Sequence, residues 1–306
     1  MQPYISEANS LAVRLRWINV QCYEIELPNR KIIVTDPFYL DSDSFRKRTK
    51  RLPAKITDEF GVYLHSGFSA EDFTGADYIL LNHIHADHAN LVGDLWRRFY
   101  GRILVPGDCA LEIAQVFDIP YAALYPLYPG NTYYFDDFTL QVFPGAHDNR
   151  VFREGSYLTP SAEKKRMVMM PNPDLFNMPW PNNTWGLGSI HNLNYVITTK
   201  NNFKIDFSAG RDFEEHVQHM QSVRPNLMLR HRIRSDSPEE CAKQIETLGA
   251  QLMLPLHHNN ARATEEDLNE YFQKVNEILA AGGSAARAFN PEPNKWYQVQ
   301  TSIVSE

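Results

Sequence analysis

The sequence predicts a mixed α/β fold for this chain of 306 residues. Apolar and polar residues alternate over 11–19, which is typical of a half-buried strand, and the short apolar run 78–81 predicts a buried one. Helix signals are equally clear, because Ser237 precedes Pro238 and two glutamates, and Gly249 ends the pattern. The chain is long enough for one large α/β domain.

Turn-forming residues set the boundaries of the remaining elements. The segments 28–30, 136–137 and 200–202 contain Pro, Asn or Asp, and each separates two strand patterns. Asp108 and Thr264 stand where helix caps are expected. Further strands are expected over 22–27, 31–35, 102–105, 133–135, 139–143, 194–199, 203–208 and 251–256, and further helices over 91–100, 108–117, 213–223 and 264–282.

Composition indicates a soluble protein without a nucleic-acid partner. Hydrophobic residues make up 43% and charged residues 22% of the chain, and the net charge of −7 argues against nucleic acid as a partner. No apolar stretch approaches about 18 residues, so no membrane span is expected. The three cysteines, Cys22, Cys109 and Cys241, form no CxxC pair, and residues 1–10 lack signal-peptide features. These features predict a cytoplasmic protein without disulfides.

The most informative stretch follows the apolar run 78–81. His83, His85, Asp87 and His88 lie within six residues, although the whole chain has only 11 histidines. If the strand continues through His85, alternation places His83 and His85 on one face. Asp87 and His88 then fall where the chain turns into a helix. Imidazole and carboxylate are the ligands of zinc and similar divalent metals, so this cluster predicts a metal site.

The pattern His83-x-His85-x-Asp87-His88 resembles the HxHxDH signature of the metallo-β-lactamase superfamily. The stretch before this motif, the single-domain length and the order of the ligands are most similar to the ascorbate-6-phosphate lactonase-like branch. The resemblance implies a single domain over 1–306, folded as a four-layer αββα sandwich with one or two metal ions at one sheet edge. It also implies that Asp36, in the Asp-Pro pair at a strand end, buttresses the metal-binding loops.

The resemblance further implies the ligands. His83, His85 and His147 would hold one ion, and Asp87, His88 and His257 the second. The expected cofactor is zinc, as one or two ions, with manganese or iron as alternatives. Asp87 would also orient the attacking hydroxide and handle its proton.

One position departs from the family pattern. Most members with two metals carry Gly-Asp after the strand that corresponds to 203–208, and the Asp bridges the ions. Here Gly210 is followed by Arg211 and then Asp212. Asp212 is either a bridging ligand, after a slip of one residue, or the cap of the helix 213–223, whereas Arg211 in the bridging place would disfavour a second ion.

Two further features each have two interpretations. Segment 151–185 combines several Met, Pro and Trp residues and is either a lid over the site or an interface with a second subunit in a homo-oligomer. The basic residues at 46–51, and Arg230, Arg232 and Arg234, are either solvated surface charge or an anion-attracting rim.

The implied function is hydrolysis, by a metal-bound hydroxide, of a small ester, lactone or phosphoester that is either anionic or neutral. Two other classes remain as alternatives. One is an iron-dependent oxidoreductase on the same scaffold, and the other is a non-catalytic metal-binding protein.

Overall fold

The computed structural model describes residues 13–38, 70–146, 192–208, 211–212, 214–231, 237–256 and 265–299. The expected ligands His147 and His257 lie outside these ranges, as do the segment 151–185, the basic residues at 46–51, Arg232 and Arg234. Asp87, Arg211 and Asp212 are described by their backbone alone.

The first sheet has seven strands in the order β15-β1-β2-β3-β4-β5-β6. Strands β15, β1, β2 and β3 pair antiparallel, whereas β3 to β6 run parallel. The connections between the parallel strands carry the helices of this half, as parallel pairing requires. The strands are β1 (Val13–Asn19), β2 (Cys22–Glu26), β3 (Ile32–Thr35), β4 (Tyr78–Leu80), β5 (Arg102–Pro106), β6 (Leu124–Leu127) and β15 (Trp296–Val299).

The second sheet has eight strands. Its order is β11-β8-β9-β10-β12-β13-β14, and β7 pairs with β8 in addition. The strands are β7 (Thr132–Tyr134), β8 (Phe138–Ala146), β9 (Asn192–Thr199), β10 (Lys204–Ser208), β11 (Arg211–Asp212), β12 (Leu227–His231), β13 (Leu252–Leu256) and β14 (Arg287–Ala288).

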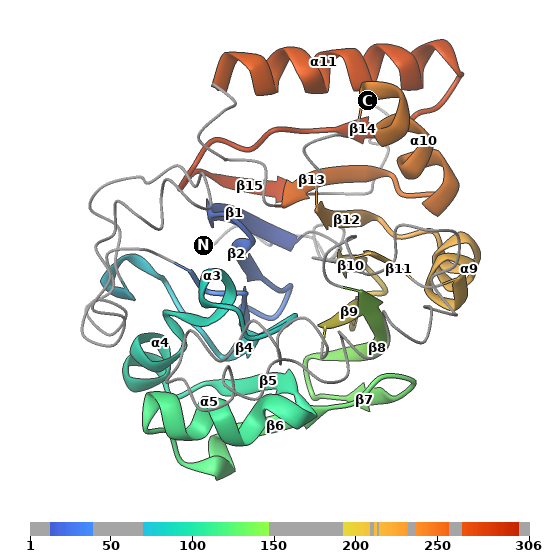
Figure 1. The fold of residues 1–306 in the computed structure, drawn as a ribbon. Coiled ribbons are helices and arrows are strands. Elements are labelled where there is room, and N and C mark those ends of the chain that lie inside the picture. Colours follow the sequence, from blue (N-terminus) through green and yellow to red (C-terminus); the bar gives the residue numbers. More distant parts are fainter. Residues whose placement is uncertain are drawn as a thin grey trace, which may run out of the picture.

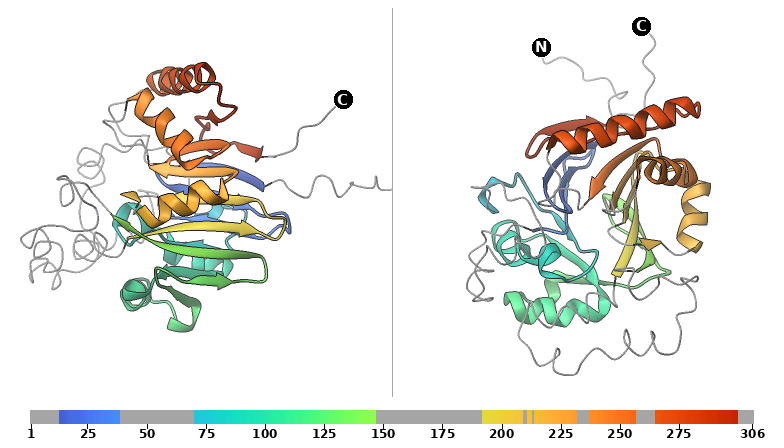
Figure 2. Two further views of the ribbon diagram at one scale, coloured as in Figure 1. Left: turned by 90° about the vertical axis from the view of Figure 1, so that its right-hand side faces the viewer. Right: turned by 45° about the horizontal axis from the view of Figure 1, so that its top comes forward.

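Helices cover the outer face of each sheet. Short helix α3 (Ala86–Ala89), α4 (Val92–Phe99) and α5 (Ala110–Phe117) lie on the first sheet, and α9 (Glu214–Val223), α10 (Pro238–Leu248) and α11 (Glu265–Ala281) on the second. The two sheets pack face to face between these helical layers (Figures 1 and 2). The predicted αββα order of layers is therefore confirmed.

Strand alternation divides the apolar side chains among three cores. In β4, Ile79 faces α4 and α5, whereas Tyr78 and Leu80 face the other sheet. In β12, Met228 faces the helices of the second half and Leu229 faces the first sheet. The inter-sheet core is thus built from the inward faces of both sheets, and its rigidity fixes the edge at which the predicted site lies.

Most predicted elements agree with the structure to within a few residues, and the predicted cap at Ser237 is a complete capping box with Glu240. Asp108 is an exception, because it lies in a 3-10 turn and α5 begins at Ala110 after Cys109. No helix in the described ranges is both long and apolar enough to cross a membrane.

Candidate metal centre

The histidine-rich loop begins where β4 stops. The predicted continuation of this strand through His85 is wrong, because β4 ends at Leu80. The amide of Asn82 donates to Asp36 Oδ1 at 2.7 Å instead of to a neighbouring strand, which turns the chain away from the sheet. His85 is then the residue before α3, so Asp87 and His88 lie on the first turn of a helix.

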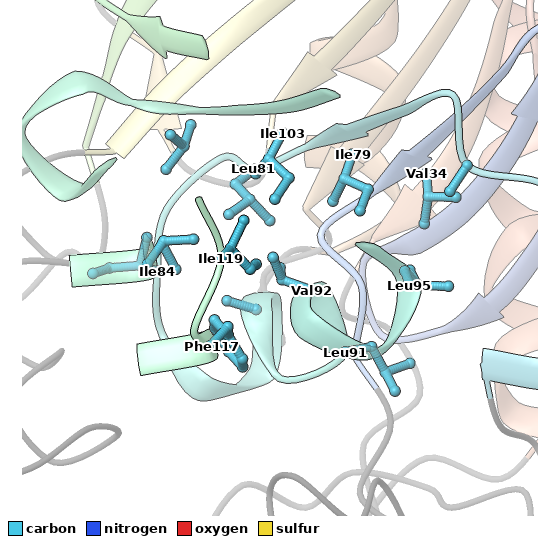
Figure 3. Close-up of a cluster of buried hydrophobic side chains, with 14 of the residues drawn as sticks. Val34, Ile79, Leu81, Ile84, Leu91, Val92, Leu95, Ile103, Phe117 and Ile119 are labelled. Carbon is cyan, nitrogen blue, oxygen red and sulfur yellow. The ribbon is translucent and has the colours of Figure 1, made fainter. Parts of the chain in front are cut away.

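Apolar residues anchor this loop in the hydrophobic core. Leu81, Ile84 and Leu91 are buried in the core between the first sheet and its helices, as Figure 3 shows. The residues on either side of Ile84 are His83 and His85, which are also buried. Hence the loop holds the two imidazoles close together although it is not a strand.

His83 and His85 present two ring nitrogens to the same point. His83 Nε2 lies 3.1 Å from His85 Nδ1, and His83 Nδ1 lies 3.1 Å from the amide oxygen of Asn82. This oxygen is nearer to Nδ1 than the amide nitrogen of Asn192 at 3.3 Å, and it favours a proton on Nδ1, so that Nε2 presents its lone pair. Two nitrogens that share a tetrahedral zinc ion, each at about 2.0–2.1 Å, are about 3.3 Å apart. The observed separation fits that arrangement.

Asp36 joins the end of β3 to this cluster. It is fully buried, and its Oδ2 lies 2.8 Å from Nδ1 of His88. A carboxylate at Nδ1 directs the lone pair of Nε2 outward, as in carboxylate–histidine–metal arrangements. The backbone of Asp36 has φ of 35°, a left-handed conformation that is costly for Asp and is typical of functional positions. The hydrogen bonds predicted between Asp36 and the loop are confirmed.

Two buried tyrosines connect the sheets at the edge that carries the site. Tyr195 of β9 donates to the carbonyl of Leu81, at 2.6 Å, two residues before His83. Tyr23 of β2 donates to the carbonyl of Pro255, at 2.8 Å. Burial raises the pKa of both hydroxyls well above the ordinary value, so both remain protonated donors. Each tyrosine therefore fixes, from the opposite sheet, a strand that leads to predicted ligands.

Replacement of Tyr195 or Tyr23 by Phe is expected to weaken metal binding by about tenfold or more, in the range found for groups that orient ligands. Each change keeps the ring and leaves a buried carbonyl with one donor fewer, at a cost of about 1–3 kcal/mol in stability. Metal titration and denaturant unfolding of the same samples would measure the two effects separately.

Tyr78→Phe is the matched control, because Tyr78 donates across the sheets to Asp137 at 2.6 Å, at the start of β4 rather than its end. It should lose stability without losing metal affinity. Equal loss of affinity in all three variants would mean that the tyrosines act only through global stability.

The other predicted ligands are described only in part. Arg211 and Asp212 form β11, which pairs with Ala146 and Gly145 at the end of β8. Helix α9 is described from Glu214, and residue 213 lies outside the described ranges, so the cap and ligand roles of Asp212 both stay predictions. Which of the two residues takes the bridging place remains a prediction. His147 directly follows β8, and His257 directly follows β13, outside the described ranges.

The described side chains alone contain no group of three His, Cys, Asp or Glu residues that could hold a metal ion. A complete centre therefore requires predicted ligands beyond them, above all His147. The donors that are described are nitrogens and oxygens, which suit zinc, iron and manganese. Cys22 is buried, and burial raises its thiol pKa far above the ordinary value, which disfavours a thiolate ligand.

Sequence reasoning did not find the asparagines of β9. Asn192 Nδ2 lies 3.3 Å from His83 Nδ1, and Asn194 Nδ2 lies 3.5 Å from His216 Nδ1. Both asparagines are buried beside Gly145, where any side chain would collide with their amide oxygens. Polar residues within an otherwise apolar strand, Asn192-Leu193-Asn194, were the signal available in the sequence.

Arg230 also differs from both interpretations of the basic pattern. It is neither surface charge nor part of an anion-attracting rim, because it is 1% exposed and donates to Asp206 Oδ2 at 2.5 Å. The other oxygen of Asp206 lies 3.2 Å from His216 Nε2. These buried groups connect β10, β12 and α9 on the helix-covered face of the second sheet.

Comparison with known proteins places the fold. The sequence matches no family model and no curated protein. Among solved structures, Igni18, a metallo hydrolase from Ignicoccus hospitalis, has a TM-score of 0.61 at 15% identity and covers 95% of this chain and 100% of its own. The metallo-β-lactamase fold protein YhfI from Bacillus subtilis has a TM-score of 0.54 at 12% identity, and the match covers 94% of this chain and 99% of YhfI.

CmlA, a diiron β-hydroxylase from Streptomyces venezuelae, has a TM-score of 0.55 at 10% identity and covers 94% of this chain and 54% of its own. Identities this low establish a shared fold and leave activity open. The two sheets, their helical layers and these structural neighbours together show that the chain has the metallo-β-lactamase fold.

Proposed function

We propose that this chain is a metal-dependent hydrolase of a small ester, lactone or phosphoester. The observation that carries the proposal is the pair His83 Nε2 and His85 Nδ1, 3.1 Å apart, beside a His88 oriented by Asp36. A divalent ion held by such a site lowers the pKa of a water molecule to about 7, which supplies a nucleophile at neutral pH.

The roles of the residues follow from this proposal. His83, His85 and His147 would hold the first ion, and Asp87, His88 and His257 the second. Asp212 would bridge the ions if it, and not Arg211, takes the bridging place. Zinc is the first expectation for the metal, with manganese and iron as alternatives.

The surrounding residues would keep the ligands in position. Asp36 holds the His88 ring through Nδ1 and the loop through the amide of Asn82. The rings of His83 and His88 lie 3.7 Å apart between centroids, so a shift of one would displace the other. Asp87 would orient the attacking water molecule and accept its proton.

Iron-dependent oxidation is the second candidate function. It is supported by the likeness to CmlA, a diiron β-hydroxylase, and by imidazole ligands that suit iron as well as zinc. The likeness alone concerns the fold, so the hydrolase remains the first proposal.

The two candidates are separated by one series of assays. Protein depleted of metal with a chelator would be reloaded with zinc, manganese or iron and tested on esters, lactones, phosphomonoesters and phosphodiesters. Hydrolysis that is lost on depletion and restored by a divalent ion is the expected result. Dioxygen consumption by the iron form, without hydrolysis by any form, would favour the oxidoreductase.

A further inference from the structure

The turn between β1 and β2 brings a glutamine against His88. β1 ends at Asn19 and β2 begins at Cys22, so Val20 and Gln21 form the turn. Gln21 is fully buried, and its Nε2 lies 2.7 Å from His88 Nε2. Because Nδ1 of His88 faces Asp36, this amide occupies the side of the ring from which Nε2 would bind a metal ion.

The backbone of this turn is held in one conformation. Val20 has φ of 49°, a left-handed value that is a genuine outlier for a β-branched residue, and it is fully buried. Thr35 Oγ1 donates to the carbonyl of Gln21 at 2.9 Å and accepts from the amide of Tyr23 at 3.0 Å. Strain of this kind persists where the surrounding structure imposes it, commonly at functional sites. The turn therefore holds the Gln21 backbone close to His88.

The Gln21 amide is incompletely satisfied in this position. Its Nε2 has His88 as a partner, but its buried Oε1 has no hydrogen-bond partner among the residues described by the structure. Buried polar atoms without partners are rare, and each one points to strain, an absent water molecule or an ion.

A metal ion on His88 could not bind beside Gln21 as it now lies. Ligand nitrogens lie about 2.0–2.1 Å from zinc, so an ion on Nε2 of His88 would lie against the Gln21 amide, whose nitrogen at 2.7 Å presents hydrogens and no lone pair. The side chain is enclosed and its backbone is fixed, so a half turn of the amide is the smallest available response. That turn brings Oε1 to the place of Nε2. Two neighbouring ligands of an octahedral ion, each at about 2.0–2.1 Å, are about 2.9 Å apart, close to the observed separation.

We infer that Gln21 is a ligand, through its amide oxygen, of the second metal ion, the one that His88 would hold. The inference rests on the proposed metal centre and extends it by one residue. An uncharged oxygen suits a hard ion with more than four ligands, so Gln21 should favour Mn²⁺ over Zn²⁺ at the second site.

The test compares Gln21→Leu, which removes the oxygen at similar size, with Gln21→Glu, which keeps an oxygen donor. Metal-free full-length protein would be titrated with Mn²⁺ and with Zn²⁺, and both stoichiometric steps would be followed. Gln21→Leu should weaken binding of the second ion by about tenfold or more, since even groups that only orient ligands contribute that much. The loss of affinity should be larger for manganese than for zinc. Gln21→Glu should bind it at least as tightly as the wild type. The first ion should be unaffected in both.

Gln141→Leu is a matched control, because Gln141 makes a similar amide–imidazole contact with His219 Nε2, at 3.0 Å, on β8. This substitution should change the affinity for neither ion. Circular dichroism melting of the metal-free proteins would verify folding. If Gln21→Leu does not fold, a loss of the manganese preference in Gln21→Glu overturns the inference by itself.

Other results would also contradict the inference. An unchanged or higher affinity of Gln21→Leu for the second ion would mean that the amide does not bind the metal or opposes its binding. A wild-type protein that binds a single ion would overturn the inference and leave metal-dependent hydrolysis standing. A wild-type protein that binds no ion would overturn the proposed function as well.

Discussion

His83→Ala and His85→Ala are expected to lose the first metal ion and to reduce hydrolysis by at least about a thousandfold. Bound metal contributes several kcal/mol to such reactions, and each 1.4 kcal/mol is a factor of ten in rate. The two variants should still fold, because the loop is anchored by Leu81, Ile84 and Leu91 and not by the imidazoles. Metal analysis and kcat/KM would be measured together with far-UV circular dichroism.

His219→Ala provides the control for this experiment. His219 lies on α9, where it contacts Gln141 and stacks near Phe143, and it is no part of the proposed centre. Its loss should leave metal content and rate unchanged. Full activity with normal metal content in either His83→Ala or His85→Ala would refute the assignment of the loop as the metal site.

Arg230→Met is expected to destabilise the protein by about 3–5 kcal/mol. The change leaves Asp206 as a buried carboxylate without its guanidinium partner, and an uncompensated buried charge is costly. Denaturant unfolding of the metal-free protein would measure the loss. The stability cost should exceed any direct effect on the metal site, because Arg230 lies on the helix-covered face of the second sheet.

The double variant Asp206→Leu/Arg230→Met distinguishes the physical cause. It removes both charges, and apolar replacement of a buried pair is often neutral or stabilising, so most of the lost stability should return. Lys274→Met, which breaks the exposed pair with Glu270, should leave unfolding unchanged within error. A double variant as unstable as Arg230→Met alone would show that packing, and not the charge pair, determines stability here.

The sequence was sufficient for most strands and helices because each of these signals was local, whereas the layered architecture was implied by the family resemblance of the histidine motif. Alternating residues in 11–19 and the apolar run 78–81 predicted strands that the structure contains, and the caps at Ser237 and Gly249 predicted α10. The end of β4 was predicted too late, because it depends on a hydrogen bond from Asn82 to Asp36, which is distant in sequence.

The candidate centre was predictable only in part, because some of its residues are distant in sequence and meet only in the folded protein. His83, His85 and His88 are adjacent in sequence, and their spacing alone indicated a shared site. Gln21 comes to His88 across 67 positions, through a turn whose conformation no local pattern indicates. Arg230 was misinterpreted because a basic residue after an apolar run has the same pattern on a surface as in a buried pair with Asp206.

The histidine-rich edge of the two sheets is expected to bind the metal ion that the proposed hydrolysis requires. Anomalous diffraction from crystals of the metal-loaded protein, recorded at the absorption edge of the bound metal, tests this expectation most directly. A peak is expected within bonding distance of His83 Nε2 and His85 Nδ1, and it should be absent from crystals of inactive, chelated protein. A loaded, active protein whose only anomalous peaks lie away from these histidines would contradict this expectation.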